Sequence, residues 1–193
     1  FKEDKAVVLS AINKGHLGLD CMPEQFKDDK GVALVSIEDT YSNFDYVSVQ
    51  LRDNKNFVLS ALSSIEQKCL KRINPWEEWS YHYPKISDFT KEFLSKVSNQ
   101  LKNDKEVVLL AVQINAENLS SASESLKEDE EVILKAAYKD WKSIAYASQR
   151  IKSSREIIVK VLKINIRALK FITPRFLIRN KKYLRSEVNL NDE

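Results

Sequence analysis

The chain has 193 residues, of which 43% are hydrophobic and 31% charged, and this balance is typical of a folded protein. Its net charge is only +3, and its three glycines and four prolines argue against turn-rich β folds and glycine-rich phosphate loops. No apolar run approaches the roughly 18 residues that a membrane-spanning helix needs, so we expect no transmembrane segment.

One motif recurs along the chain at a constant interval, without any shift of frame. Its copies are FKEDKAVVLSA at residue 1, FKDDKGVALVS at 26, LRDNKNFVLSA at 51, LKNDKEVVLLA at 101, LKEDEEVILKA at 126 and IKSSREIIVKV at 151. The stretch at residue 76 departs from the motif. This self-similarity predicts about seven units, starting near 1, 26, 51, 76, 101, 126 and 151, with the fourth irregular.

Two columns of helix-capping residues predict two short helices in each unit. The fourth position of the unit holds Asp4, Asp29, Asn54, Asp104, Asp129 and Ser154. Eleven positions later stand Thr40, Thr90, Asn115, Asp140 and Asn165, with Gly15 and the exception Ile65. Such side chains accept hydrogen bonds from the amides of a first helical turn. We therefore expect roughly 13–15 helices of about ten residues each, and no sheet.

Apolar residues follow the first cap at helical spacing, and one large side chain lies four positions beyond the second cap. This column of large side chains contains Leu19, Phe44, Leu94, Leu119, Ile144 and Leu169, with Cys69 as a smaller variant. Short helices are marginal in isolation, so each unit must bury its apolar stripe against its neighbours. The prediction is an all-α fold in which tandem two-helix repeats stack as an α-solenoid, with a compact helical bundle as the alternative. A single domain would span 1–186, followed by a polar tail over 187–193.

The unit resembles the helical repeats grouped as domain of unknown function 4116. The closest match is LKNDKEVVLLAVQINAENLSSASESLKEDEEVILKAA at 101–137, and the similarity extends more weakly over 1–72 and 151–172. The resemblance implies an α-helical repeat of the kind found in bacterial proteins, among them effectors of intracellular pathogens. It implies no activity and no site residues. We accordingly expect a cytoplasmic location or delivery into a host cytosol.

The stretch NPWEEWSYHYP at 74–84 interrupts the helical pattern. Pro84 stands where other units have Leu or Val, and a proline inside a helix costs about 3 kcal/mol, so we expect no regular helix over 83–86. Two interpretations remain open for its large side chains: they fill a gap in the stack, or they form an exposed anchor for a protein partner. The candidate partner-binding residues are Trp76, Trp79, Tyr81, His82 and Tyr83.

Catalytic and metal-binding residues have weak support in the sequence. His16, Asp20 and Cys21 lie close together, but Cys21 falls off the helical face that the other two would share. His82 lies near two glutamates without a second ligand at a helical spacing. We expect no cofactor, no metal and no catalytic residues. Cys21 and Cys69 fit small hydrophobic roles in a reducing compartment.

Positive charge gathers at the end of the chain, where residues 150–185 hold twelve Lys and Arg against the single acid Glu156. Thr173 and Pro174 predict the start of a closing helix over about 174–186. An anionic partner, whether membrane lipid, nucleic acid or acidic protein, is one explanation, and a contact with the acidic units or a flanking domain is another. The candidate anion-binding residues are Lys160, Lys163, Arg167, Lys170, Arg175, Arg179, Lys181, Lys182 and Arg185.

These observations predict a non-enzymatic helical-repeat scaffold that binds a protein partner and forms part of a longer protein. The alternative is a module that docks onto anionic membrane lipid or nucleic acid through its C-terminal units. A third hypothesis is that the chain flanks and orients a catalytic domain.

Overall fold

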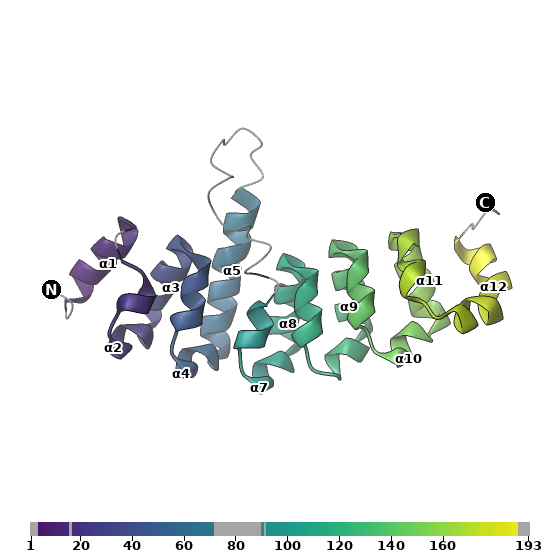
Figure 1. The fold of residues 1–193 in the computed structure, drawn as a ribbon, viewed down its shortest axis with the longest axis horizontal. Helices are drawn as coiled ribbons and strands as arrows, with labels where there is room; N and C mark the ends of the chain where they lie inside the picture. Colours follow the sequence, from purple (N-terminus) through teal and green to yellow (C-terminus); the bar gives the residue numbers. More distant parts are fainter. Residues whose placement is uncertain (1–3, 16, 72–89, 91, 189–193) are drawn as a thin grey trace.

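The computed structural model describes residues 4–15, 17–71, 90 and 92–188, with only the backbone described for 69–71. Over these residues the chain is helical and contains no strand, which confirms the all-α prediction. The helices follow one another in chain order along an elongated row (Figure 1). Residues 101–172 are fully described and contain no strand, and the helix that begins at Lys105 ends at Ile114, before the cap residue Asn115.

Three kinds of element alternate along the row. The upright helices in Figure 1 are α1 (Lys5–Asn13), α3 (Lys30–Asp39), α5 (Lys55–Lys71), α8 (Lys105–Ile114), α9 (Glu130–Lys139) and α11 (Arg155–Ile164). They are followed by 3₁₀ helices, namely η1 (Leu19–Cys21), η2 (Tyr41–Tyr46), η4 (Phe93–Lys96), η5 (Ala116–Ser121), η7 (Trp141–Tyr146) and η8 (Ile166–Phe171). Short helices lead into the next layer: α2 (Glu24–Lys27), α4 (Val49–Arg52), α7 (Asn99–Lys102), η6 (Leu126–Glu128) and α10 (Gln149–Lys152). The chain closes with α12 (Pro174–Val188).

The expectation of a second ten-residue helix in each unit was wrong, and a third column of caps explains why. In α4, α7 and α10 the serines Ser48, Ser98 and Ser148 each cap the short helix by accepting a hydrogen bond from a first-turn amide. Each serine lies eight positions after the second capping position. The 3₁₀ helix between the two caps, as in η2 and η7, therefore has only six residues, which suffice for two turns.

Every residue of the first predicted capping column accepts a hydrogen bond from a first-turn amide. In the second column Asn115, Asp140 and Asn165 do so, whereas Thr40 makes no side-chain cap hydrogen bond. Asp104 accepts hydrogen bonds from the amides of Glu106 and Val107, at 3.1 and 3.2 Å, and Asn115 caps the following 3₁₀ helix. Where a cap is missing, the helix continues. Ile65 occupies the second column and lies inside the 17-residue α5. Arg179 stands one period after Ser154 and lies inside the 15-residue α12.

The core runs the length of the row as one continuous apolar cluster. Five members of the predicted column of large side chains, Leu19, Phe44, Leu94, Leu119 and Ile144, are fully buried. Leu169 is half-buried, and the side chain of Cys69 lies outside the described residues. The predicted helical stripe Val107, Val108, Ala111 and Val112 is also fully buried. The positions that the sequence pattern predicts to be apolar are therefore those that form the core.

The described parts of the third and fourth units pack together as a single layer. Helix α5 packs directly against α8. Lys55 bonds to Asp104, two units further along the chain, at 2.8 Å, whereas Lys105 makes the equivalent contact with Asp129 of the next unit. The ring centroid of Phe93 lies 4.3 Å from that of Phe44. Helix α5 thus supplies the first helix of this layer, and η4 supplies the second element.

Buried asparagines connect successive layers at two places. The Oδ1 atom of Asn118 accepts a hydrogen bond from the Leu94 amide at 3.0 Å, and its Nδ2 atom donates to the Thr90 carbonyl at 2.6 Å. Asn43 accepts from the Leu19 amide at 3.2 Å in the same way. Sequence reasoning missed both residues, although they occupy the same position in the repeating frame.

Among the described residues, no helix is both long enough and apolar enough to cross a membrane.

Candidate binding surfaces

A stripe of half-buried leucines recurs along the upright helices. The ninth residue of the unit provides Leu9, Leu34, Leu59, Leu109 and Leu134, all packed against the core. Over α5, α8 and α9 the stripe opens into a groove of about 400 Å³, where Leu59, Leu109 and Leu110 contribute apolar surface. This surface, called the leucine groove below, can take apolar side chains of another molecule.

Charged and polar side chains border the leucine groove. Glu106 and Glu131 line it, and each is held by a lysine of the preceding layer, Lys55 at 2.9 Å and Lys105 at 2.8 Å. Hydrogen bonds to Asp104 and then to Glu106 raise the pKa of Lys55. Gln113, also in the lining, donates a hydrogen bond to Glu66 of α5. The acidic rim is thus already paired, and the apolar floor remains open.

The candidate aromatic anchor, Trp76, Trp79, Tyr81, His82 and Tyr83, lies outside the described residues, so its two interpretations stay open. The described chain shows only where this stretch is connected. Helix α5 precedes it, and Thr90, which is buried, follows it. Both of these belong to the single layer that borders the leucine groove.

The predicted basic surface is divided by ion pairs. Lys160 lies between Glu130 at 2.7 Å and Glu156 at 2.8 Å, and these hydrogen bonds raise its pKa. Lys163 lies 3.6 Å from Glu187 of α12. Neither Glu130 nor Glu187 falls within 150–185, so the local charge count could not reveal these partners. Lys160 and Lys163 therefore contribute less positive field than expected.

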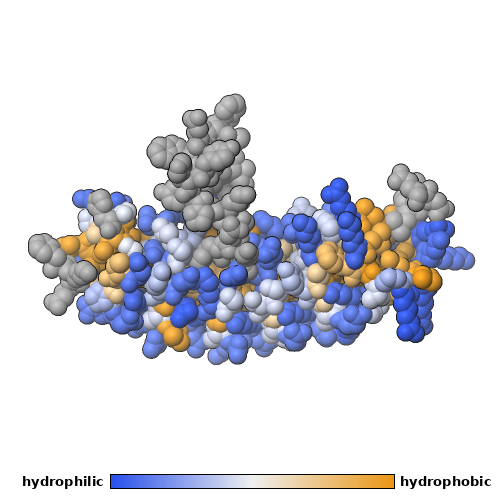
Figure 2. Space-filling view, in the orientation of Figure 1, coloured by the Kyte–Doolittle hydropathy of each residue, from blue (hydrophilic) through white to orange (hydrophobic). Residues whose placement is uncertain are grey.

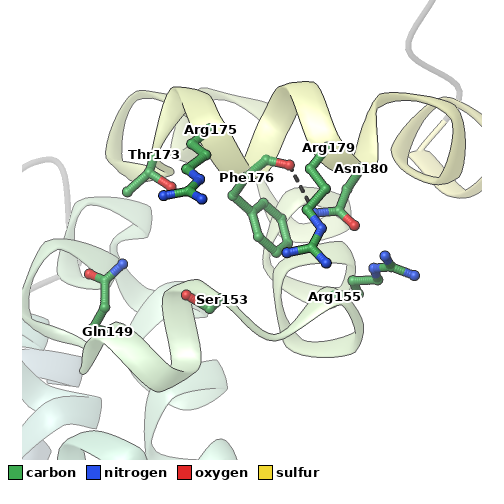
Figure 3. A pocket seen from close by; sticks show the side chains of 8 residues that line it. All are labelled: Gln149, Ser153, Arg155, Thr173, Arg175, Phe176, Arg179 and Asn180. Atoms are coloured by element: carbon green, nitrogen blue, oxygen red, sulfur yellow. Dashed lines mark hydrogen bonds between the residues drawn. The ribbon is translucent and has the colours of Figure 1, made fainter.

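The remaining candidates separate into two groups. Arg167 and Lys170 on η8, with Lys181, Lys182 and Arg185 on α12, are exposed to solvent. Arg175 and Arg179 are exposed as well, but they also line a cleft of about 370 Å³ between α10, α11 and α12 (Figure 3). Arg155, which the sequence analysis missed, lines the same cleft. The available signal was the change from Glu-Asp-Glu at 128–130 to Ser-Ser-Arg at 153–155.

The Cys21 thiol is exposed at the end of η1, so the expected small hydrophobic role is wrong for this residue. Its Sγ atom lies 3.4 Å from Oδ2 of Asp20, while His16 lies outside the described residues. In the described part of the chain, no three His, Cys, Asp or Glu side chains gather closely enough to hold a metal ion.

Apolar surface is scattered over the visible face of the row. Figure 2 shows a largely hydrophilic face with apolar side chains gathered near α1 and again around α11 and α12. Among exposed apolar residues, Val49 lies on α4 and Ile178 on α12. These residues lie on elements other than those that form the leucine groove.

No curated protein and no solved structure matches the chain. Two consecutive stretches, residues 86–127 and 129–177, match the family model described as Domain of unknown function (DUF4116). Together they span a little under half of the chain, and the resemblance expected from the repeat pattern is confirmed over both.

Proposed function

We propose that the chain is a non-enzymatic α-solenoid that binds a segment of a partner protein. The recurring contacts between layers support the solenoid: Lys5 with Asp29 and Lys105 with Asp129 are equivalent pairs in different layers, as are the contacts of the two buried asparagines. Such a stack presents successive equivalent surfaces in a line, which suits an extended partner.

The observation that carries this proposal is the leucine groove. Leu59, Leu109 and Leu110 come from two neighbouring helices, are only half-buried, and lie over a continuous core. Burying them fully would gain about 25 cal/mol for each Å² of apolar surface removed from water. Because the glutamates on the rim already pair with Lys55 and Lys105, the partner segment is one that presents apolar side chains.

Docking onto anionic membrane lipid or nucleic acid through the C-terminal units is the weaker candidate. It needs a continuous positive surface, whereas Lys160 is held between two glutamates and Lys163 lies beside a third. The internal ion pairs therefore favour a protein partner.

The test compares a groove variant with a matched surface variant. Leu110→Lys places a charge on the apolar floor, and Val49→Lys makes the same kind of change on α4, where Val49 is 68% exposed. Proteins captured from cell lysate by the wild type should be lost with Leu110→Lys and retained with Val49→Lys, while circular dichroism confirms that both variants fold. A photo-cross-linker at Ser63, in the groove lining, should label the same partner. Equal capture by both variants would exclude the groove as the binding surface.

The aromatic stretch offers a separate prediction. If Trp79 anchors the partner, Trp79→Ala should weaken capture and leave the melting temperature nearly unchanged. If it packs against the stack, the melting temperature should fall, and capture should fall only as the protein unfolds. Capture and thermal denaturation measured on the same sample decide between the two interpretations.

A further inference from the structure

We propose that the cleft between α10, α11 and α12 binds a phosphate monoester carried by a small, hydroxyl-bearing molecule. This cleft, called the arginine cleft below, is lined by Arg155, Arg175 and Arg179 together with Ser153, Thr173 and Asn180 (Figure 3). Arg175 and Arg179 lie one turn apart on α12, and Arg155 begins α11. Guanidinium groups are well suited to phosphate because they donate several hydrogen bonds in a fixed geometry.

The three arginines have no carboxylate partner among the described residues. The ion pairs of this end of the chain involve Lys160, Lys163 and Arg150 instead. Arg155 lies over the ring of Tyr183, 5.9 Å from its centroid, a contact that orients the side chain without neutralising its charge. Positive charges that share one cleft repel each other, so a bound anion would relieve an existing repulsion.

Comparison with the preceding layer shows what the arginine cleft lacks. One layer earlier, Arg150 bonds to Glu128 through Nε at 2.8 Å and to the Glu128 carbonyl oxygen through Nη2 at 2.8 Å. Moving this pair forward by one period of the repeat leads to Arg175 and Ser153. The arginine is kept, but a serine stands where its carboxylate partner would be. An external anion would take the place of that missing carboxylate.

A buried amide adds a requirement for a hydrogen-bond donor. The side chain of Asn180 is only 4% exposed, and its Nδ2 atom donates to the Phe176 carbonyl at 2.8 Å. Its Oδ1 atom is buried and has no partner among the described residues. Buried acceptors are rarely left unpaired, and a bare phosphate oxygen cannot donate to this one. A hydroxyl group of the ligand can.

The backbone favours the same ligand. Thr173 and Pro174 place the start of the 15-residue α12 at the cleft, and the positive end of a helix dipole attracts an anion. A volume of about 370 Å³ falls in the range for small ligands. These features together fit a phosphorylated polyol, either free in solution or as the headgroup of a lipid.

The sharpest test restores the missing carboxylate. Ser153→Glu recreates the pair that Arg150 makes with Glu128, and Ser153 is exposed, so the variant should fold. Isothermal titration in low salt, with myo-inositol 1-phosphate as the probe, should show binding to the wild type. Binding should fall by about tenfold or more in Ser153→Glu and in Arg175→Gln, since each removes a charge-assisted contact. Lys139→Gln makes the same loss of charge at an exposed residue of α9, outside the lining of the cleft, and this matched control should bind like the wild type.

Binding measurements with other probes identify the chemistry of the ligand and its source. Inorganic phosphate and myo-inositol should each bind more weakly than the probe, because each supplies only half of the recognised groups. Vesicles with and without a phosphatidylinositol monophosphate show whether a lipid headgroup also enters, and their binding should likewise be lost in Ser153→Glu. No binding of any phosphate probe by the wild type would overturn the proposal. Equal weakening by Lys139→Gln and Arg175→Gln would also overturn it, because it would indicate general charge attraction.

Discussion

Replacing Asn118 by alanine should destabilise the stack more than any change of similar size on its surface. Asn118 is 1% exposed and connects two layers. Its Oδ1 atom accepts from the Leu94 amide, and its Nδ2 atom lies within hydrogen-bond distance of the Thr90 and Ala111 carbonyls, at 2.6 and 3.1 Å. Alanine removes both functions and leaves the surrounding backbone in place.

The magnitude follows from the groups left without a partner. The Ala111 carbonyl keeps a second hydrogen bond, from the Asn115 amide at 3.0 Å. The Leu94 amide has only the Asn118 side chain as its hydrogen-bond partner among the described residues, and Leu94 is fully buried. A buried unsatisfied group costs about 1–3 kcal/mol, so the loss of the partner of the Leu94 amide alone should cost about that much.

Ser143 provides the matched control. It occupies the position of Asn118 one layer later, is also buried, and its Oγ atom has no partner among the described residues. Ser143→Ala should therefore change the free energy of unfolding by less than about 0.5 kcal/mol. Urea denaturation followed by circular dichroism measures both variants, and hydrogen exchange at the Leu94 amide gives a local readout. Equal stability of the two variants, or unchanged exchange at Leu94, would refute the assigned role of Asn118.

Three further predictions concern the frame, the core and the ion pairs. Deleting residues 65–89 should leave a folded protein, because Thr90 then follows Ser64 directly, at the second capping position of a regular unit. Loss of the helical circular dichroism signal would contradict the single-layer assignment. Leu119→Ala should cost about 2–5 kcal/mol, and Leu169→Ala clearly less because Leu169 is half-buried, as measured by urea denaturation. Burial raises the pKa of Asp129, but hydrogen bonds from Lys105 and the Val132 amide outweigh it and lower this pKa below 3.8. A carboxyl of lowered pKa stabilises the fold above about pH 4 and loses that contribution as the pH falls further. Asp129→Asn should therefore be less stable than the wild type at pH 7, and the difference should shrink below pH 4. Urea denaturation at several pH values measures this difference.

The upright helices were predictable because capping is a local effect. A side chain such as Asp104 satisfies amides two and three positions away, so the sequence alone contains the interacting groups. The exceptions follow the same rule. Ile65 cannot accept a hydrogen bond, and α5 continues through it; Arg179 cannot either, and α12 continues through it. Both long helices mark positions where a cap is absent.

The surfaces were less predictable because they depend on contacts between layers. Lys160 appeared to be a free cation until the preceding layer placed Glu130 beside it, 30 residues away in the chain. The arginine cleft likewise joins residues of α10, α11 and α12, and nothing local links Arg155 to Arg179. The leucine stripe was visible as a recurring leucine, but its partial exposure depends on the packing of neighbouring helices.

Residues 65–89 add one period of sequence between α5 and the next part of its layer, so counting periods gives one layer too many. Contacts across this segment span one additional period: Lys55 reaches Asp104 in the second unit after its own, whereas Lys5 reaches Asp29 in the very next unit. A connection between two parts of one layer needs no particular length, because the cost of closing a loop changes slowly with the number of residues. The cost of closing the loop therefore does not explain why the segment is one full period long. The frame continues through it, while each layer packs only against its neighbours. For this reason α5 packs directly against α8, and Gln113 of the leucine groove donates a hydrogen bond to Glu66 of α5.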